Sequence, residues 1–337
     1  MDTGAGVPGD LVVLGGDIGG TSTRIVVVDR AGEVLGRGVA GGGNPISNPD
    51  TAAVALGEAL GRALHGLDPV RVRAAVIGVA GGGSLGDASV GARFARAWSS
   101  AGLTCEPGYR SDLEVAFASG TAEPDGSVLI AGTGAVAGVI SDHRLGHTVD
   151  GHGWLLGDDG SGFWIGRQAV RAALRSLESD EAPGVLVRSV LNHLDADHAT
   201  GRDSERARVI RAVHARPPVR LSELAPLVTA AYAVGDPVAD RIVDGAVRRL
   251  AESLDRIRAG DRPGPLVLAG SLTREDSPIG ARLRSLLAER LVTEPVTARD
   301  EVVGAAWLAL LATEPGSATP QLWGRLTSMT KSDRTDS

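Results

Sequence analysis

The most constraining feature of this chain is a pattern that occurs twice: an apolar strand, a glycine-rich turn and a second apolar strand. The first copy is LGGDIGGTSTRIVVVD, from Leu14 to Asp29, and the second is SVLIAGTGAVAGVIS, from Ser127 to Ser141. A plain hairpin needs only two turn residues such as Asn-Gly, whereas the first turn combines an aspartate, glycines and hydroxyl side chains. Two similar units so far apart in the chain predict two related halves.

The rest of the chain alternates between strand and helix patterns, which predicts an α/β fold. Residues 11–17, 23–29 and 33–40 are expected to form a meander of strands, and 72–83 and 265–272 to form buried strands. A helix is expected to begin at Asn48, as a cap followed by Pro49 and Asp50. Further helices are expected in 92–102, 183–260 and 300–312, and the last two dozen residues are polar and expected to fray.

The composition excludes several kinds of site. The single lysine, Lys331, lies in the polar tail, which argues against a Walker A, protein-kinase or Schiff-base lysine. The single cysteine, Cys105, excludes a disulfide framework and a cysteine-based zinc or iron–sulfur site within one chain, and is expected to be a small buried hydrophobe.

Charge and hydropathy predict the class of partner and the location. The net charge is −7, so no basic field favours nucleic acid. No segment reaches about 18 uninterrupted apolar residues, so no membrane span is expected. Residues 1–10 lack the features of a signal peptide, and a cytoplasmic protein is the default expectation.

The two glycine turns have the chemistry of phosphate binding. Asp17 would repel a phosphate directly, but it could hold a hydrated Mg²⁺ that bridges to nucleotide phosphates. The backbone N–H groups and the hydroxyl of a Gly-Gly-Thr or Gly-Thr-Gly turn can approach a phosphate closely. These residues are Gly19, Gly20 and Thr21 in the first turn and Gly132, Thr133 and Gly134 in the second. Metal and backbone dipoles would then replace the missing lysine.

Asp112 is the candidate catalytic base. Phosphoryl transfer needs a group that accepts the proton of the attacking hydroxyl, and a carboxylate at a helix start is held rigidly. The segment SDLEVAFASGT is also an ordinary capped helix start, so a purely structural role for Asp112 is open at this level.

The order of these motifs resembles the actin-like ATPase superfamily of sugar kinases, chaperones and actin. Within it the chain resembles the N-acetylglucosamine kinase branch, of the BadF/BadG/BcrA/BcrD ATPase type. The resemblance covers roughly residues 12–312. It rests on the Asp17–Thr21 turn, SDLEVAFASGT, IAGTG, GHGWLLGDDGSGFWIG, VLAGS and GAAWLA.

The resemblance implies a two-lobed, ribonuclease H-like fold with ATP and sugar in a cleft between the lobes. The lobes are expected at residues 1–117 and 118–337, with the helix 300–312 packing back on the first lobe. By motif position, Asp112 is the catalytic base, Thr21 and Thr133 are phosphate threonines, and Gly270 and Ser271 form a nucleotide turn. The residues expected near the sugar are Asn44, Asp112, Ala135, Val136, Gly151, His152, Gly153 and Asp158.

Some of these residues have a structural alternative. Asn44 could serve only the turn before Pro45, and Asp158 with Asp159 could form an acidic turn that caps the next helix; Asp159 is expected to be structural. The eukaryotic N-acetylglucosamine kinases carry Ser-Asn where this chain has Ala135-Val136, and Trp where it has His152. These differences leave the substrate more open than the reaction.

The sequence therefore predicts an ATP- and Mg²⁺-dependent amino-sugar kinase, with N-acetylglucosamine as first substrate and glucosamine or N-acetylmuramic acid as alternatives. The partner is expected to be a small-molecule sugar rather than nucleic acid or a membrane, and a homodimer is left open. One rival is an ATP-driven activase of a partner reductase, which would need two cysteines per chain for a shared cluster. Another is a sugar-sensing DNA regulator, which would need a DNA-binding segment before the first strand.

Overall fold

The computed structural model describes residues 11–46, 48–80, 87–179, 182–195, 202–258, 264–290, 294–316 and 318–328. These residues fall into two compact units. The first unit comprises residues 1–125, 140–145 and 298–337, and the second comprises 126–139 and 146–297. The chain therefore crosses between units several times, whereas the sequence predicted one boundary between residues 117 and 118, with the helix 300–312 packing back on the first lobe. Residues 118–125, 140–145 and 298–328 all group with the first unit.

The first unit is built on a five-stranded sheet in the order β3-β2-β1-β4-β5. Its strands are β1 (Val12–Ile18), β2 (Thr23–Asp29), β3 (Val34–Ala40), β4 (Val72–Val79) and β5 (Pro107–Ser111). The first three form the predicted antiparallel meander, while β4 runs parallel to β1 and β5 runs parallel to β4. The carboxyl ends of β1, β4 and β5 consequently lie at one edge of the sheet.

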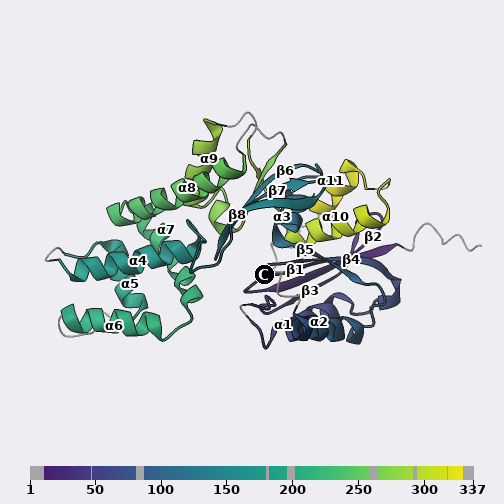
Figure 1. The fold of residues 1–337 in the computed structure, drawn as a ribbon, viewed down its shortest axis with the longest axis horizontal. Coiled ribbons are helices and arrows are strands. Elements are labelled where there is room, and N and C mark those ends of the chain that lie inside the picture. Colours follow the sequence, from purple (N-terminus) through teal and green to yellow (C-terminus); the bar gives the residue numbers. More distant parts are fainter. Residues whose placement is uncertain are drawn as a thin grey trace, which may run out of the picture. The chain divides into compact units, whose positions relative to one another are not determined.

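Helices cover both faces of this sheet, as Figure 1 shows. The helices α1 (Ala52–Ala63) and α2 (Ala88–Ser100) share one apolar core with the strands, and α3 (Asp112–Gly120), α10 (Glu301–Thr313) and α11 (Pro320–Ser328) share another. A short 3-10 turn, η1 (Pro69–Arg71), precedes β4. The helix α10 approaches β1 so closely that a Cβ on Gly15 would lie 2.2 Å from the Val302 carbonyl oxygen.

Two local predictions in this unit are wrong. The first helix begins at Ala52, after Thr51, and not at Asn48. The Asn48 side chain instead donates a hydrogen bond to the Gly20 carbonyl, 28 residues earlier in the chain. This tertiary contact takes the place of the local hydrogen bond by which Asn48 would cap a helix. The chain after residue 313 is not wholly frayed, because α11 buries Leu322 and Leu326 in the core; residues 329–337 lie outside the described residues.

The second sheet has the order β10-β9-β6-β7-β8. Its strands are β6 (Gly126–Ala131), β7 (Ala135–Ser141), β8 (Arg144–Asp150), β9 (Leu266–Ala269) and β10 (Val296–Thr297). Read from the β8 end, this is the strand order of the first sheet: three consecutive strands, then two that arrive after helical crossovers. The two related halves predicted from the repeated strand–turn–strand pattern are confirmed.

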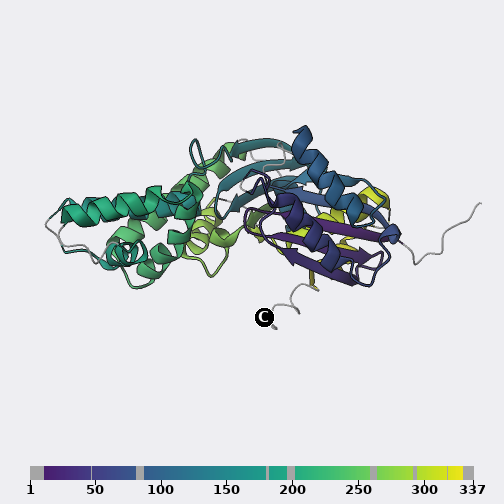
Figure 2. The ribbon, with the colours of Figure 1, turned by 90° about the horizontal axis from the view of Figure 1, so that it is seen from below.

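Helices make up much of the second unit, and they are drawn in teal to yellow-green in Figure 2. They are α4 (Gly162–Leu177), α5 (Val185–His193), α6 (Arg202–His214), α7 (Ala225–Ala233), α8 (Pro237–Ile257) and α9 (Pro278–Ala288), with short 3-10 segments η3 (Pro218–Leu224) and η4 (Ser271–Thr273). Their apolar faces form one continuous core with β6, β7 and β9. Among all described helices, none is both long and apolar enough to span a membrane.

Candidate active site

The predicted residues of the first unit gather at the carboxyl edge of its parallel strands. The first glycine turn follows β1, Ala80 follows β4, and Asp112 follows β5. The Ala80 N–H donates to the Ile18 carbonyl at 3.2 Å, which ties the ends of the two inner strands together. In open α/β sheets, ligands bind outside the carboxyl ends of the strands. This edge is therefore where a ligand of the first unit is expected.

The first glycine turn is held by the loop that follows β3. The Gly19 carbonyl accepts the N–H groups of Gly43 at 3.1 Å and Asn44 at 3.0 Å. The next carbonyl, that of Gly20, accepts the Asn48 side-chain amide at 2.9 Å. Two consecutive carbonyls thus point toward Gly43, Asn44 and Asn48.

This arrangement frees two donors on the opposite side of the turn. In a trans peptide the N–H points away from the carbonyl of the preceding residue, so the N–H groups of Gly20 and Thr21 face away from the loop. Both residues are exposed, and these N–H groups make no hydrogen bond within the described part of the chain. Adjacent, parallel N–H groups of this kind form an anion-binding concavity.

Asn44, the predicted sugar-contacting residue, lies in the loop that holds this turn. Its side-chain amide donates to the Ala80 carbonyl at 2.9 Å, and its side-chain oxygen accepts the Ile46 N–H at 2.8 Å. The side chain is almost fully buried. Asn44 therefore links the loop to the end of β4, and a sugar contact remains a prediction.

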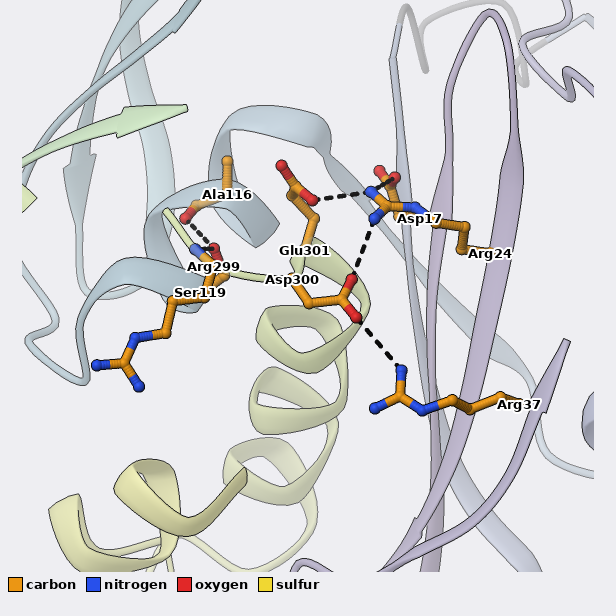
Figure 3. Close-up of polar contacts among 8 residues, drawn as sticks. All are labelled: Asp17, Arg24, Arg37, Ala116, Ser119, Arg299, Asp300 and Glu301. Atoms are coloured by element: carbon orange, nitrogen blue, oxygen red, sulfur yellow. Dashed lines mark hydrogen bonds and ion pairs between the residues drawn. The ribbon is translucent and has the colours of Figure 1, made fainter. Parts of the chain in front are cut away.

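Asp17 lies directly opposite Arg24 in the antiparallel β1–β2 pair. The Arg24 guanidinium donates from Nη2 to Asp17 Oδ2 at 2.6 Å and to Glu301 Oε2 at 2.8 Å, and from Nη1 to Asp300 Oδ1 at 3.1 Å. Figure 3 shows Arg24 enclosed by these three carboxylates, with Arg37 on the far side of Asp300. Arg24, Asp300 and Glu301 were not predicted from the sequence, since the two acids lie far from Arg24 in the chain.

The electrostatic surroundings of Asp17 favour its protonated form. Burial raises its pKa from 3.8 to about 6, and the nearby Glu301 and Asp112 carboxylates act in the same direction. The Arg24 guanidinium opposes both effects and favours the ionised form. Among the described residues there is no group of three or more His, Cys, Asp or Glu that could enclose a metal ion. The water-mediated Mg²⁺ contact expected of Asp17 is therefore still a prediction.

Asp112 is the first residue of α3, but it does not cap the helix. Ser111 caps it, because its hydroxyl oxygen accepts the Leu113 N–H at 3.2 Å. Glu114 completes the capping box by accepting the Ser111 N–H at 2.7 Å. The structural explanation of this motif is thus satisfied by Ser111 and Glu114, and it does not require Asp112.

The Asp112 carboxylate is held at a fixed angle with one oxygen left over. Its Oδ1 accepts the Ser111 hydroxyl at 3.1 Å and the Leu113 N–H at 3.0 Å, while Oδ2 has no partner in the described residues. Burial raises the pKa of Asp112 above its ordinary value of 3.8. A raised pKa makes a carboxylate a better proton acceptor near neutral pH.

The second unit brings its two predicted nucleotide turns together. The parallel strands β6 and β9 pair, with Ile130 opposite Ala269, so the turns that follow them share one edge. Gly270 has a φ of +89°, and a Cβ there would lie 2.3 Å from the Ala131 carbonyl oxygen. Glycine is required at 270 for this close approach, and the adjacent Ser271 is exposed.

The Gly132–Gly134 turn repeats the geometry of the first turn. The carbonyls of Gly132 and Thr133 accept the N–H groups of Gly162 at 2.8 Å and Phe163 at 3.1 Å, at the start of α4. The N–H groups of Thr133 and Gly134 consequently point the other way. They make no hydrogen bond within the described residues. A Cβ on Gly132 would meet open space, so packing within the described chain does not explain this glycine.

Asp150, at the end of β8, organises the predicted sugar loop and was not predicted from the sequence. Its two carboxylate oxygens accept the N–H groups of Asp158 at 2.7 Å and Asp159 at 2.9 Å. Asp159 also pairs with Arg249 at 3.2 Å, in line with its expected structural role. The only signal in the sequence was an acidic residue directly before Gly-His-Gly.

The residues expected to contact the sugar from this unit lie together. The Asp158 carboxylate accepts the Ala135 N–H at 3.1 Å, and the Ala135 carbonyl accepts the Gly151 N–H at 3.1 Å. Val136 packs against Gly151 so closely that a Cβ added to Gly151 would lie 2.7 Å from Val136 Cγ2. Burial raises the pKa of Asp158 above its ordinary value, although the hydrogen bond from the Ala135 N–H and the neighbouring His152 act in the opposite direction.

Gly153, like the rest of 151–156, is exposed. The second unit therefore presents an accessible loop beside its Gly132–Gly134 turn, and Asp150 and Asp158 hold that loop through backbone N–H groups.

Comparison with known proteins identifies the family. Residues 14–309 match the BadF/BadG/BcrA/BcrD ATPase family. The chain belongs to this family. The resemblance predicted from the glycine turns is thus confirmed over most of the chain.

One protein with a similar sequence comes from Clostridium acetobutylicum and is named N-acetylmuramic acid/N-acetylglucosamine kinase. It is 30% identical over 152 residues. The alignment covers 44% of this chain and 46% of the relative, so the chain matches about half the length of that protein.

Solved structures show the same fold. A candidate N-acetylglucosamine kinase from Chromobacterium violaceum has a TM-score of 0.68 at 22% identity, covering 89% of this chain and 98% of that one. A second candidate, from Porphyromonas gingivalis, has a TM-score of 0.67 at 22% identity, covering 90% and 99%. A ROK family glucokinase from Streptomyces griseus, in complex with glucose and AMPPNP, has a TM-score of 0.58 at 20% identity, covering 88% and 99%. The predicted actin-like ATPase fold is confirmed.

Proposed function

We propose that this member of the BadF/BadG/BcrA/BcrD ATPase family is an ATP-dependent sugar kinase. The observation that carries the proposal is the shared geometry of the two glycine turns. Each turn has two consecutive carbonyls tied to the chain behind it and two consecutive N–H groups turned away, with no hydrogen bond to the described residues. Such paired donors suit the oxygen atoms of a nucleotide's phosphates. The glucokinase with the same fold binds AMPPNP, which supports ATP as the phosphate donor.

The residues present fit a hydrated Mg²⁺. Mg²⁺ retains several waters and binds through one or two carboxylates together with substrate phosphates. Asp17 offers one oxygen, Oδ1, that Arg24 does not occupy, at the edge where the phosphate turn begins. When bound, the metal would neutralise charge on the transferred phosphoryl group. Asp17 would hold its water shell.

Asp112 is proposed as the general base. Asp112 Oδ2, which has no partner in the described residues, would accept the proton of the sugar's 6-hydroxyl. At the same time the oxygen of that hydroxyl would form a bond to the γ-phosphorus of ATP. The bond from the γ-phosphorus to the bridging oxygen breaks, and ADP leaves with the electron pair. The hydroxyl of Ser111 and the N–H of Leu113 hold Oδ1 and so aim the carboxylate. This positioning contributes to the rate together with the proton transfer itself.

The proposed acceptor is an amino sugar, with N-acetylglucosamine first and glucosamine or N-acetylmuramic acid as alternatives. The loop that begins at Gly151 would carry it, with His152 and Asp158 as polar neighbours and Val136 as an apolar one. The relative from Clostridium acetobutylicum is named for N-acetylmuramic acid and N-acetylglucosamine, which supports this class. Thr21, Thr133 and Ser271 would contribute hydroxyl groups to the nucleotide.

An activase of a partner reductase is disfavoured, because one cysteine per chain provides two thiolates in a dimer where a shared cluster needs four. A DNA regulator is disfavoured by the acidic net charge. Iron content and a gel shift at moderate salt test these two alternatives.

The substrate is tested by measuring ADP release with N-acetylglucosamine, glucosamine, N-acetylmuramic acid, N-acetylmannosamine and glucose. The proposal predicts release that depends on the sugar and is highest with N-acetylglucosamine. Equal ADP release with and without sugar would contradict the kinase proposal, and preference for glucose would contradict the amino-sugar assignment.

A further inference from the structure

We infer that Arg24 is a positioning residue for the metal-facing carboxylate of Asp17, and that Asp300 and Glu301 hold Arg24 in that role. The inference rests on the proposed function, because it takes Asp17 to face the metal–nucleotide. It adds three residues that no motif of the sequence indicated. The observation that carries it is the juxtaposition in Figure 3 of one guanidinium and three carboxylates from distant parts of the chain.

The contacts of Arg24 show that its donors point at carboxylates. Nη2 is shared between Asp17 and Glu301, and Nη1 donates to Asp300. The remaining guanidinium nitrogen, Nε, is buried without a partner in the described residues. Both terminal nitrogens are thus engaged by carboxylates, which argues against Arg24 as a direct ligand of a phosphate.

The charge balance explains why Arg24 needs two acids besides Asp17. A lone guanidinium beside Asp17 could swing toward the phosphates of an incoming nucleotide, since Arg binds phosphate well. Asp300 and Glu301 retain it on the protein side of Asp17. Asp300 also accepts a hydrogen bond from Arg37, at 3.3 Å to Oδ2, on the side away from Arg24. The ion pairs of Arg24 with Asp300 and Glu301 therefore restrain Asp17 Oδ2 and leave Oδ1 for the water shell of a metal.

A purely structural role for Arg24 is the competing explanation, since its ion pairs connect β2 to the start of α10. The docking of α10 has other sources, however. Val302, Val303 and Trp307 are buried in the core shared with the sheet, and α10 contacts β1 at Gly15. Arg37 also links the sheet to Asp300, from β3, through an ion pair that does not involve Asp17. Arg37 is therefore the matched control for the structural part of the cluster.

The test compares Arg24→Gln, Arg24→Lys and Arg37→Gln by calorimetric binding of ADP with and without Mg²⁺, alongside the Mg²⁺ dependence of sugar phosphorylation. For Arg24→Gln we expect binding of ADP with Mg²⁺ to weaken by about 10- to 100-fold, as substitutions behind a metal ligand commonly do. Metal-free ADP binding should change less than twofold. Arg24→Lys should show a smaller loss in the same direction, and Arg37→Gln should retain the Mg²⁺ dependence of the wild type.

Equal weakening of ADP binding with and without Mg²⁺ in Arg24→Gln would overturn the inference and make Arg24 a phosphate ligand or a structural tie. The same loss in Arg37→Gln would also overturn it. Should Arg24→Gln not fold, Arg24→Lys decides: unchanged Mg²⁺ dependence contradicts the inference. A wild-type protein that binds no ADP with Mg²⁺ at all would instead contradict the proposed function, so the two failures are distinguishable.

Discussion

At the residue scale, Asp112 and Glu114 lie in the same turn of α3 but have different roles: Asp112 is the proposed catalytic base and Glu114 stabilises the start of the helix. Glu114 completes the capping box of Ser111, whereas Asp112 shares only the Leu113 N–H with that cap and keeps Oδ2 without a partner in the described residues. We predict that Asp112→Asn reduces kcat by about 10²- to 10⁴-fold, the usual contribution of a general base. Its melting temperature and its affinity for ADP should stay close to those of the wild type. Steady-state kinetics with calorimetric ADP binding measures both.

Glu114→Ala is the control, because it removes the side chain that accepts the Ser111 N–H and leaves both hydrogen bonds of Asp112 Oδ1 in place. It should lower the free energy of unfolding by about 0.5–2 kcal/mol, the range for lost capping interactions, and leave a kcat near that of the wild type at temperatures where it is folded. Full activity in Asp112→Asn would remove Asp112 from the mechanism.

The pH dependence follows from the raised pKa of Asp112. Because burial favours its protonated form, the base is lost as pH falls through a value above the ordinary 3.8. Asp17, with a pKa of about 6, is coupled to it, so kcat/KM in the free enzyme reports apparent values of the pair. We expect the acidic limb of kcat/KM to lie above 3.8, the ordinary pKa of an aspartate. A limb at or below that value would contradict the assigned environment.

The raised pKa of Asp17 also makes the stability of the fold depend on pH, and this contribution falls as pH rises. A group whose folded pKa is raised binds more protons in the folded than in the unfolded state. The contribution of Asp17 to stability is therefore complete below pH 3.8 and is lost as pH rises through about 6.

Asp17 and Asp112 could be found from the sequence because their chemistry is local to a motif. Arg24, Asp150, Asp300 and Glu301 could not. The role of Arg24 depends on partners 276 and 277 residues away, and only the folded chain brings them together. Asp150 acts through backbone N–H groups, which leave no trace in residue types.

At the element scale, the glycine turns give the sharpest contrast between neighbouring positions. A Cβ on Gly132 meets nothing within the described chain, whereas a Cβ on Gly134 would lie 2.9 Å from Asp158 Oδ1. We predict that Gly132→Ala keeps the wild-type melting temperature but binds ATP more weakly, since its methyl group would occupy space left for phosphate. Thermal melts and ATP titration measure the two effects.

Gly61→Ala, at an open position within α1, is the control for adding a methyl group and should leave ATP affinity unchanged. Unchanged ATP affinity in Gly132→Ala as well would contradict the phosphate assignment of the second turn.

The predicted helices and strands were right where the apolar pattern in the sequence was long. They were wrong where a tertiary contact determined where an element begins. The meander, the second strand–turn–strand unit and the helix beginning near residue 300 could all be read from periodicity. The start of α1 could not, because the Asn48 side chain that would cap a helix bonds to Gly20 instead.

At the scale of the whole molecule, the matching strand orders of the two sheets explain why the sequence pattern repeats. The duplication alone does not indicate that the chain returns to the first unit after residue 297. The family resemblance predicted this return for the helix 300–312, but it did not predict α11. The segment that forms α11 contains few apolar residues, and its sequence therefore predicted a polar, frayed end of the chain. The two leucines that the structure buries, Leu322 and Leu326, are too few to indicate a packed helix from the sequence alone.

The burial of Leu326 gives a stability prediction for this return. Its side chain is 1% exposed and lies against Gly32 in the first unit. Leu326→Ala should lower the free energy of unfolding by about 2–5 kcal/mol, as for other buried leucines. Chemical denaturation measures it, with the exposed Val234→Ala as a control that should change stability by less than about 0.5 kcal/mol. A neutral Leu326→Ala would mean that α11 is not part of the core.

The central claim is that this chain transfers a phosphoryl group from ATP to the 6-hydroxyl of an amino sugar. The most direct measurement follows the reaction of N-acetylglucosamine, ATP and Mg²⁺ by ³¹P NMR. The account predicts one sugar 6-phosphate for each ADP formed, and almost no product with Asp112→Asn. ADP and inorganic phosphate in equal amounts, with no sugar phosphate, would contradict it.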